Sequence, residues 1–450
     1  MITLSICSGS GTHLCSTLLL ASVAAMFLYV YTIHDTFHTR SGESSFSQPT
    51  ASRDQDLPQS SFETVPLTAS IQKPLTGSAK RPSSANNPIF FKDLKYSTEK
   101  EKQHVVFVKV HKAASTTMQS IFLRYAIEHD LNVLLSKSGL HINERSNHIP
   151  LNDLYPVPAG SRYDILCNHL IFDYKKISPL FPEDTFYLGI VREPFSQFLS
   201  AFVYYSQVWK SQILIKAIKA APDNPIEEFL NHSMSYVGNE KPNTVFINNR
   251  MSVDFGFPLE NFEASKRNHS QIASFLKKID TTFDVVLIAE MFDESLVLLR
   301  RMLGWTTKDI IYLDKNVFSA KHEIPSWIRR HDYPPHVKHL FRNWAAIDIS
   351  FYNYFLNKFK DRISFQPKDF YSEVKAFKTL KPRIASYCSA VNSTGYLHFQ
   401  ATEYTSEFVL TQNDCALMNA NEYLLTSKAQ NVQKHRFFKM GKPPQKFNES

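Results

Sequence analysis

Cysteine is scarce in this sequence, with 5 residues in a chain of 450. This excludes the small secreted folds in which a dense disulfide framework replaces a hydrophobic core. One pair, Cys388 and Cys415, could still close a loop, while ordinary buried or free thiols are the alternative for every cysteine. Cys7 precedes a long apolar run and Cys15 lies at its start, where cysteines can be acylated.

Blocks of lysine and arginine are missing, as are repeats that combine basic with aromatic residues. The net charge of +8 is therefore scattered, and we expect no nucleic-acid partner. A scattered excess fits an anionic small molecule or an ordinary solvated surface. We also find no group of metal-ligating residues with convincing spacing, so no metal is expected.

The N-terminus contains one long uncharged run, Leu14 to Ile33. A helix needs about 20 apolar residues to cross a bilayer. A cleaved signal peptide, the alternative, has a basic segment and a shorter apolar core, whereas residues 1–13 contain no Lys or Arg. We predict a short tail at residues 1–13 and an uncleaved transmembrane anchor at residues 14–33.

Residues 34–102 are rich in Ser, Thr, Pro and Gln and poor in large apolar side chains. Such a segment buries too little surface to offset the entropy of ordering, so we predict a disordered stem. Beyond it, N-x-[ST] sequons at Asn231, Asn268 and Asn392 are candidate glycosylation sites and favour a lumenal body. A fourth sequon, at Asn448, lies too close to the end to carry weight.

Short apolar runs after Gln103 predict buried strands of a parallel sheet. There are four of them, at residues 105–110, 163–167, 185–191 and 283–289. Helical patterns lie between them, which predicts an α/β domain at residues 103–360 with a central, mostly parallel sheet flanked by helices. Residues 361–450 are predicted to be a partly ordered extension. Ligands of such sheets bind beyond the carboxyl ends of the strands.

The first strand is followed by the stretch "HKAASTT" and then by a helical pattern. The unpaired N–H groups at a helix start bind anions, hydroxyls add donors, and Lys112 adds a charge. This predicts a phosphate-binding loop made of Lys112, Ala113, Ala114, Ser115, Thr116 and Thr117. The nucleoside triphosphatase loop G-x-x-x-x-G-K-[ST] does not match, because the glycines are missing and the lysine precedes the hydroxyls. A capped helix with a solvated lysine is the alternative.

A second anion site is predicted after the third strand. Arg192 follows that strand at once, and Ser200 lies eight residues later, about two helical turns on. Guanidinium binds phosphate bidentately, although an arginine here could also form a structural ion pair. Two separate anion sites suit 3′-phosphoadenosine 5′-phosphosulfate (PAPS), which has an anionic group on each side of its ribose, better than ATP with its single phosphate chain.

These motifs resemble those of sulfotransferases, and most of all galactosylceramide sulfotransferase and the related galactose 3-O-sulfotransferases. The loop K-T-H-K-T-A-S-S-T of that family reads "KVHKAASTT" here, with Val110 and Ala113 in place of threonines. The stretch "CNHLIF" resembles C-N-H-M-R-F, with Ile171 in place of arginine. Further similar stretches are "NNRMSVDFGF" at residues 248–257 and "FDVVLIAEMFDESLVLLRRMLGW" at residues 283–305.

The resemblance implies a P-loop-type sulfotransferase fold and a single-pass type II Golgi membrane protein with a lumenal catalytic domain. It further implies transfer of a sulfuryl group from PAPS to the 3-hydroxyl of a β-galactosyl residue, on a glycolipid or a glycoprotein glycan. A homodimer is possible. Because of the replacements at Val110 and Ile171, a sulfotransferase for another glycan, such as a glycosaminoglycan, stays open. A non-catalytic Golgi glycan-binding protein and a P-loop kinase are further alternatives.

Sulfuryl transfer needs positioning and charge stabilisation more than covalent chemistry. We assign Lys112 to neutralise the charge that develops on the leaving oxygens. A histidine at a strand end suits the general base, because its pKa of about 6.5 lies near working pH. His169 follows the second strand, as the base does in cytosolic sulfotransferases, and is preferred. His111, next to Lys112, is the rival, and either histidine could be structural.

Overall fold

The centre of the fold is a parallel sheet with the strand order β2-β1-β3-β4. Its strands are β1 (Val105–Val108), β2 (Ile165–Leu166), β3 (Phe186–Val191) and β4 (Val285–Ile288). Every residue in them is buried, because helices cover both faces. The computed structural model describes residues 101–314, 325–328, 333–390 and 395–445, and the predicted α/β class with its parallel sheet is confirmed.

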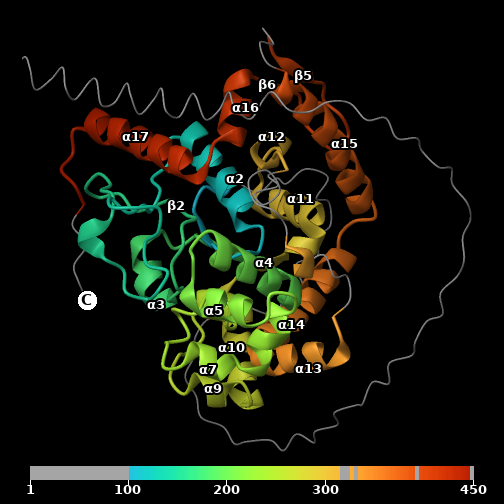
Figure 1. Cartoon of the computed structure of the whole chain (residues 1–450). Helices are drawn as coiled ribbons and strands as arrows, with labels where there is room; N and C mark the ends of the chain where they lie inside the picture. Colours follow the sequence, from blue (N-terminus) through green and yellow to red (C-terminus); the bar gives the residue numbers. More distant parts are fainter. Residues whose placement is uncertain (1–100, 315–324, 329–332, 391–394, 446–450) are drawn as a thin grey trace, which may run out of the picture. The chain divides into compact units, whose positions relative to one another are not determined.

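Helices of different lengths lie between and after the strands (Figure 1). Those between β1 and β4 are α2 (Ser115–Glu128), α3 (Tyr174–Ile177), α4 (Pro194–Gln207), α5 (Gln212–Ala220), α6 (Pro225–Asn231), α7 (Ser233–Val237), α8 (Arg250–Asp254), α9 (Phe262–Ser265) and α10 (His269–Thr282). Those after β4 are α11 (Phe292–Leu303), α12 (Thr307–Ile310), α13 (Pro335–Trp344), α14 (Ala346–Ser364), α15 (Phe370–Ser389), α16 (Gln412–Asn419) and α17 (Glu422–Met440). Single 3-10 turns are Leu151–Asp153, Ser178–Leu180, Ala289–Met291 and Ser326–Ile328.

Apolar side chains form two clusters. The larger one surrounds the sheet and continues into the C-terminal helices as far as Ala429. The smaller one is rich in aromatic rings and joins α4 to α7 with α13. Since α4 begins directly after β3, it connects the carboxyl end of that strand to this second cluster.

One glycine in β3 is required by a close approach. A β-carbon on Gly189 would lie 2.3 Å from the ring of Phe255, well inside van der Waals contact. Phe255 follows α8 directly and is 1% exposed. The missing side chain therefore lets the end of α8 pack flat against the middle of the sheet.

The C-terminal segment packs back onto the first helix of the sheet. α17 lies beside α2 (Figure 1), and a short hairpin of β5 (Leu397–Phe399) and β6 (Phe408–Leu410) precedes α16. A disulfide joins Cys388 in α15 to Cys415 in α16. Among the described residues, no helix is long and apolar enough to span a membrane. The predicted anchor at residues 14–33, and the stem up to residue 100, lie outside the described residues.

Candidate active site

The loop between β1 and α2 is a tight turn built without glycine. Lys112 has φ of 60° and Ala114 has φ of 58°, both in the left-handed region. Each such non-glycine residue costs roughly 1–3 kcal/mol and persists only where the surroundings enforce it. α2 begins at Ser115, so its first N–H groups follow the turn directly, where N–H groups at a helix start are suited to an anion.

The predicted loop residues differ in what they can offer a ligand. The Ser115 hydroxyl donates to the carbonyl of Val110, so it helps to close the turn rather than standing free. Ala113 is fully buried and can contribute only its backbone. Thr116 and Thr117 are partly exposed, which leaves their hydroxyls accessible at the start of α2.

The two predicted anion sites adjoin each other. Arg192 follows β3, and its Nη1 donates to the carbonyl of Lys112 at 3.2 Å. The Lys112 ammonium lies 4.0 Å from the ring centroid of Tyr204, which is on α4. Burial, together with the positive charges of Arg192 and Lys109, lowers the pKa of Lys112 to about 8. Positive charges close enough to lower the pKa of a lysine also attract an anion to the same place.

α4 begins next to Arg192, in the second of the predicted anion sites. Pro194 occupies its first turn, and the Glu193 carboxylate caps it by accepting from the N–H groups of Phe195 and Ser196. The Glu193 N–H in turn donates to Glu290, at 2.8 Å. Ser200 lies further along α4 and is partly buried; within the described part of the chain, no hydrogen bond involves its hydroxyl.

His169, the preferred base, has a defined tautomer. Its Nδ1 lies 2.9 Å from the carbonyl oxygen of Lys109, an acceptor, so Nδ1 carries the proton and Nε2 carries the lone pair. Burial, followed by the nearby charges of His111 and Lys109, holds the pKa of His169 well below its usual value. His169 is therefore neutral near pH 7, in the form that can accept a proton at Nε2.

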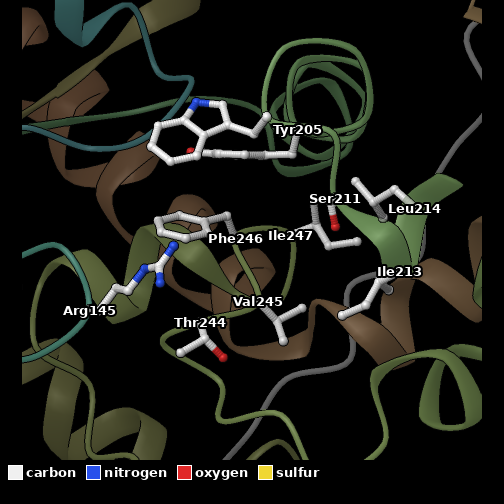
Figure 2. A pocket seen from close by; sticks show the side chains of 10 residues that line it. Arg145, Tyr205, Ser211, Ile213, Leu214, Thr244, Val245, Phe246 and Ile247 are labelled. Atoms are coloured by element: carbon white, nitrogen blue, oxygen red, sulfur yellow. The ribbon is translucent and has the colours of Figure 1, made fainter. Parts of the chain in front are cut away.

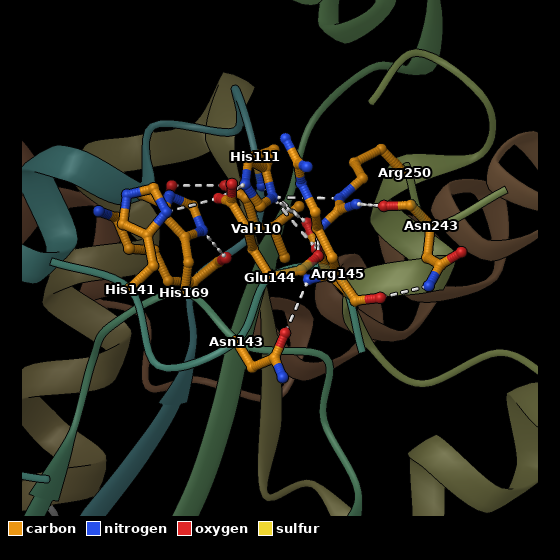
Figure 3. Close-up of polar contacts among 12 residues, drawn as sticks. Val110, His111, His141, Asn143, Glu144, Arg145, His169, Asn243 and Arg250 are labelled. Carbon is orange, nitrogen blue, oxygen red and sulfur yellow. Dashed lines mark hydrogen bonds and ion pairs between the residues drawn. The ribbon is translucent and has the colours of Figure 1, made fainter. Parts of the chain in front are cut away.

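His111, the rival, is enclosed by carboxylates (Figure 3). Its Nδ1 lies 2.8 Å from Asp254 and its Nε2 lies 3.2 Å from Glu144, while its backbone N–H also donates to Asp254. Its ring stacks on that of His169 with centroids 3.8 Å apart. Since both ring nitrogens face carboxylates, His111 has no nitrogen left for a substrate hydroxyl.

A buried ionic cluster surrounds these histidines. Arg250 and Asp254 form a fully buried ion pair of 2.8 Å along α8, and Arg250 also donates to the carbonyls of Asn243 and Glu144. Burial raises the pKa of the Glu144 carboxyl, but hydrogen bonds from His111 and His141 outweigh it and hold that pKa below its usual range. A buried charge needs such partners, so the cluster fixes the ring of His111.

Part of this cluster escapes sequence reasoning. The i,i+4 spacing of Arg250 and Asp254 on a short helix was the only signal for their pairing. The sequence contains no pattern that would indicate a role for Glu144 or His141, because they lie in a segment without regular structure. Ile171, where the family motif has arginine, is 5% exposed and belongs to the hydrophobic core. Among the described residues, no group of three or more His, Cys, Asp or Glu side chains could hold a metal.

An aromatic cavity of about 180 Å³ opens beside the cluster (Figure 2). Phe246 links the two, because its ring centroid is 5.1 Å from that of His111 and 4.9 Å from that of Tyr205. The cavity is lined by Arg145, Tyr205, Trp209, Ser211, Ile213, Leu214, Thr244, Val245, Phe246 and Ile247. Such a mixture of aromatic rings with a few polar groups is typical of small-molecule sites.

Two of the sequons lie at the surface. Asn231 is exposed at the end of α6, and Asn268 is exposed at the start of α10, where its Oδ1 accepts from the N–H of Gln271. That contact leaves the amide nitrogen of Asn268, the atom that carries a glycan, outside the cap. Asn392 and Asn448 lie outside the described residues.

The fold and site define an α/β protein in which the carboxyl ends of parallel strands bring together a glycine-free loop and an arginine. The chain belongs to the galactose-3-O-sulfotransferase family, whose sequence model matches residues 52–403. The resemblance seen in the motifs is thereby confirmed.

Curated relatives share this family. Galactose-3-O-sulfotransferase 3 of Mus musculus is 32% identical over 262 residues, which are 58% of this chain and 57% of the relative. Galactose-3-O-sulfotransferase 2 of Homo sapiens is 29% identical over 289 residues, 63% of this chain and 68% of the relative. Galactosylceramide sulfotransferase of Homo sapiens is 24% identical over 291 residues, 64% of each chain. The match thus spans little more than half the length of the first of these relatives.

Proposed function

We propose that this chain transfers a sulfuryl group from PAPS to a hydroxyl of a galactosyl residue, most specifically the 3-hydroxyl. The observation that supports this most is the contact of Arg192 with the carbonyl of Lys112, since it brings two separate anion sites together at the strand ends. One site suits the 5′-phosphosulfate of the donor and the other suits its 3′-phosphate. The names of the relatives supply the sugar and its position.

Each end of the donor has residues to hold it. The N–H groups at the start of α2, with Thr116 and Thr117, suit the 5′-phosphosulfate. Arg192 and Ser200 suit the 3′-phosphate through charged hydrogen bonds. Lys112 stands between them and neutralises the charge that grows on the oxygen between sulfur and phosphorus as that bond breaks. We expect its ammonium, which lies over the Tyr204 ring, to turn toward a bound donor.

His169 is the proposed base. The acceptor oxygen forms its bond to sulfur while the sulfur–oxygen bond to the nucleotide breaks, and the hydroxyl proton passes to Nε2 of His169. The products are a sugar sulfate ester and adenosine 3′,5′-bisphosphate. The carbonyl of Lys109 holds the Nδ1 proton, so Nε2 is the nitrogen that faces this task. His111 instead keeps the ring of His169 in place through stacking.

The aromatic cavity is the proposed acceptor site. A galactosyl ring has an apolar face that packs on aromatic side chains, and Tyr205, Trp209 and Phe246 supply such surfaces. Trp209 is 48% exposed, so it can cover part of a glycan that extends into solvent. Replacing Trp209 with Ala should raise the KM for the acceptor while the KM for PAPS stays unchanged.

We further propose that the protein works in the Golgi lumen, held by the anchor at residues 14–33. The disulfide between Cys388 and Cys415 supports an oxidising compartment, and the exposed sequons at Asn231 and Asn268 support glycosylation. Endoglycosidase should then shift the mobility of the protein on a gel, and alkaline carbonate should fail to extract it from membranes. A secreted product that begins after residue 33 would contradict the anchor.

Radiolabelled PAPS offered with a panel of acceptors tests the function. The panel holds galactosylceramide, β-galactosides of glycoprotein type and glycosaminoglycan fragments. Label on a galactosyl 3-hydroxyl is the expected result, and the preferred acceptor decides between glycolipid and glycoprotein. Label only on glycosaminoglycans would contradict the proposed sugar. Binding of PAPS without transfer to any acceptor would favour a non-catalytic glycan-binding protein.

A further inference from the structure

The donor loop, residues 111–114, contains two strained residues and no glycine. Lys112 and Ala114 both have left-handed backbones, which side-chain-bearing residues adopt only when their surroundings enforce it. The Ser115 hydroxyl bond to Val110 closes the turn from inside. Arg192 donates to the carbonyl of Lys112, and the His111 N–H donates to Asp254, so these contacts fix the loop from β3 and α8. The residues just before and after the loop are joined by a further set of contacts.

A buried side chain bridges those two ends. Lys109 precedes the loop, and its ammonium donates to Oε1 of Gln119, one turn into α2, at 2.8 Å. Gln119 uses its own Nε2 to donate to Asn168, beside His169, at 2.7 Å. The carbonyl of Lys109 accepts from His169 as well. Lys109, at the end of β1, therefore contacts Gln119 on α2 directly and also contacts His169, the proposed general base.

The ammonium of Lys109 depends on one carboxylate. Its side chain is only 1% exposed, and Glu422 accepts from it at 2.5 Å. Burial lowers the pKa of Lys109, and Glu422 is the main group that opposes this fall. A buried ammonium without its counterion is strongly unfavourable, so the loss of Glu422 would drive Lys109 to lose its proton or to leave its place.

Glu422 lies in a part of the chain that the family match does not reach. The match ends at residue 403, while Glu422 opens α17. That helix is anchored well away from the loop: Gln433 accepts from the N–H of Val133 and donates to the carbonyl of Pro156. α17 is thus held against α2 by contacts that do not involve Glu422. These contacts fix the position of Glu422, the first residue of α17, next to Lys109.

We propose that Glu422 is a positioning residue for the donor loop: through Lys109 and Gln119 it holds the two ends of the loop in the conformation that binds the 5′-phosphosulfate of the donor. This rests on the proposed function for the identity of the ligand. The conformation of the loop itself can be measured without any ligand, so the two ideas can fail separately.

The Glu422→Gln substitution tests the proposal, because glutamine keeps the shape and removes the charge. Hydrogen exchange of the ligand-free protein should be faster in peptides covering residues 110–117 than in the wild type. Affinity for adenosine 3′,5′-bisphosphate should fall about tenfold, as expected when one ligand-free protein in ten keeps the competent loop. Affinity for adenosine 3′-phosphate, which lacks the 5′ group, should stay unchanged, whereas general damage to the fold would weaken both.

Matched variants complete the test. Glu407→Gln removes a carboxylate from an exposed ion pair with His398 and should change neither measurement. Lys109→Met should reproduce the effect of Glu422→Gln, and the double variant should add nothing to it, because both changes break one chain of contacts. If Glu422→Gln fails to fold, the double variant, which buries no unpaired ammonium, takes its place in both assays.

Unchanged exchange in the loop of a folded Glu422→Gln protein would overturn the proposal. So would additive effects in the double variant, which would show that Glu422 acts by another route. If the wild type fails to bind adenosine 3′,5′-bisphosphate, the proposed function is wrong, while the exchange data still decide whether Glu422 holds the loop.

Discussion

Replacement of His169 by glutamine separates the two candidate bases most directly. The glutamine amide can still donate to the carbonyl of Lys109, which now accepts from Nδ1 at 2.9 Å, so the local structure should survive. The amide has no atom that takes up a proton near neutral pH. His169→Gln should therefore bind adenosine 3′,5′-bisphosphate normally and lose turnover.

The size of the loss follows from the surroundings of His169. General-base catalysis contributes roughly 10²- to 10⁴-fold. Burial and the neighbouring charges hold the pKa of His169 well below its usual value. A base with a lower pKa has a smaller driving force for taking the proton from the hydroxyl. The lower part of that range, about 10²- to 10³-fold in kcat, is the expected loss.

The pH dependence gives a second signature. The base acts only when unprotonated, so wild-type kcat/KM should fall as pH drops through the pKa of His169, on an acid limb well below pH 6.5. His169→Gln should lack that limb. The assay is single turnover of labelled PAPS with a saturating galactoside between pH 4.5 and 8.

His111→Gln is the control. It removes the partner of two buried carboxylates, Asp254 and Glu144, so its main expected effect is lower stability. The assignment is refuted if His169→Gln turns over normally while a folded His111→Gln protein does not. The base would then lie on the donor loop.

Further predictions concern three other charged residues. Lys112→Ala should lose about 10²- to 10³-fold in kcat while it remains folded. Because the pKa of Lys112 is about 8 and its charged form is the one that stabilises the leaving group, wild-type kcat/KM for PAPS should fall as pH rises above that value. Lys112→Arg should move this alkaline limb of the pH profile to higher pH. A limb that stays in place would show that another group causes it. Arg192→Ala should weaken PAPS about tenfold or more, by roughly 1.5–3 kcal/mol, and spare adenosine 5′-phosphosulfate; equal losses in calorimetry would show that Arg192 does not read the 3′-phosphate. Arg250→Ala should lower the free energy of unfolding by roughly 3–5 kcal/mol in denaturant titration, while Lys358→Ala, which breaks an exposed pair with Asp280, should cost at most about 1 kcal/mol.

The parallel sheet could be predicted because its strands are continuous apolar runs, a pattern that depends on local sequence alone. The anion loop and Arg192 could be predicted for a related reason: each directly follows a strand, and the carboxyl ends of parallel strands meet at one edge of the sheet. That Arg192 contacts the carbonyl of Lys112 follows from the pairing of β1 with β3.

The enclosure of His111 and the support of the loop could not be predicted. Glu144 reaches His111 from a segment without periodicity, and Glu422 reaches Lys109 across 313 positions of the chain. Neither carboxylate differs in sequence from an ordinary surface residue. Only the tertiary packing of α17 on α2 brings Glu422 to a buried ammonium, and no local pattern encodes that packing.

The contact between Gly189 and Phe255 has a consequence for the history of this fold. A methyl group at position 189 would occupy space that the ring of residue 255 already fills, so position 189 cannot take a larger residue while that ring is present. In related sequences, a larger residue at position 189 should appear only together with a smaller one at position 255. The pair should therefore covary. Since residue 255 directly follows α8, we expect a change there to affect also the placement of Arg250 and Asp254 beside His111.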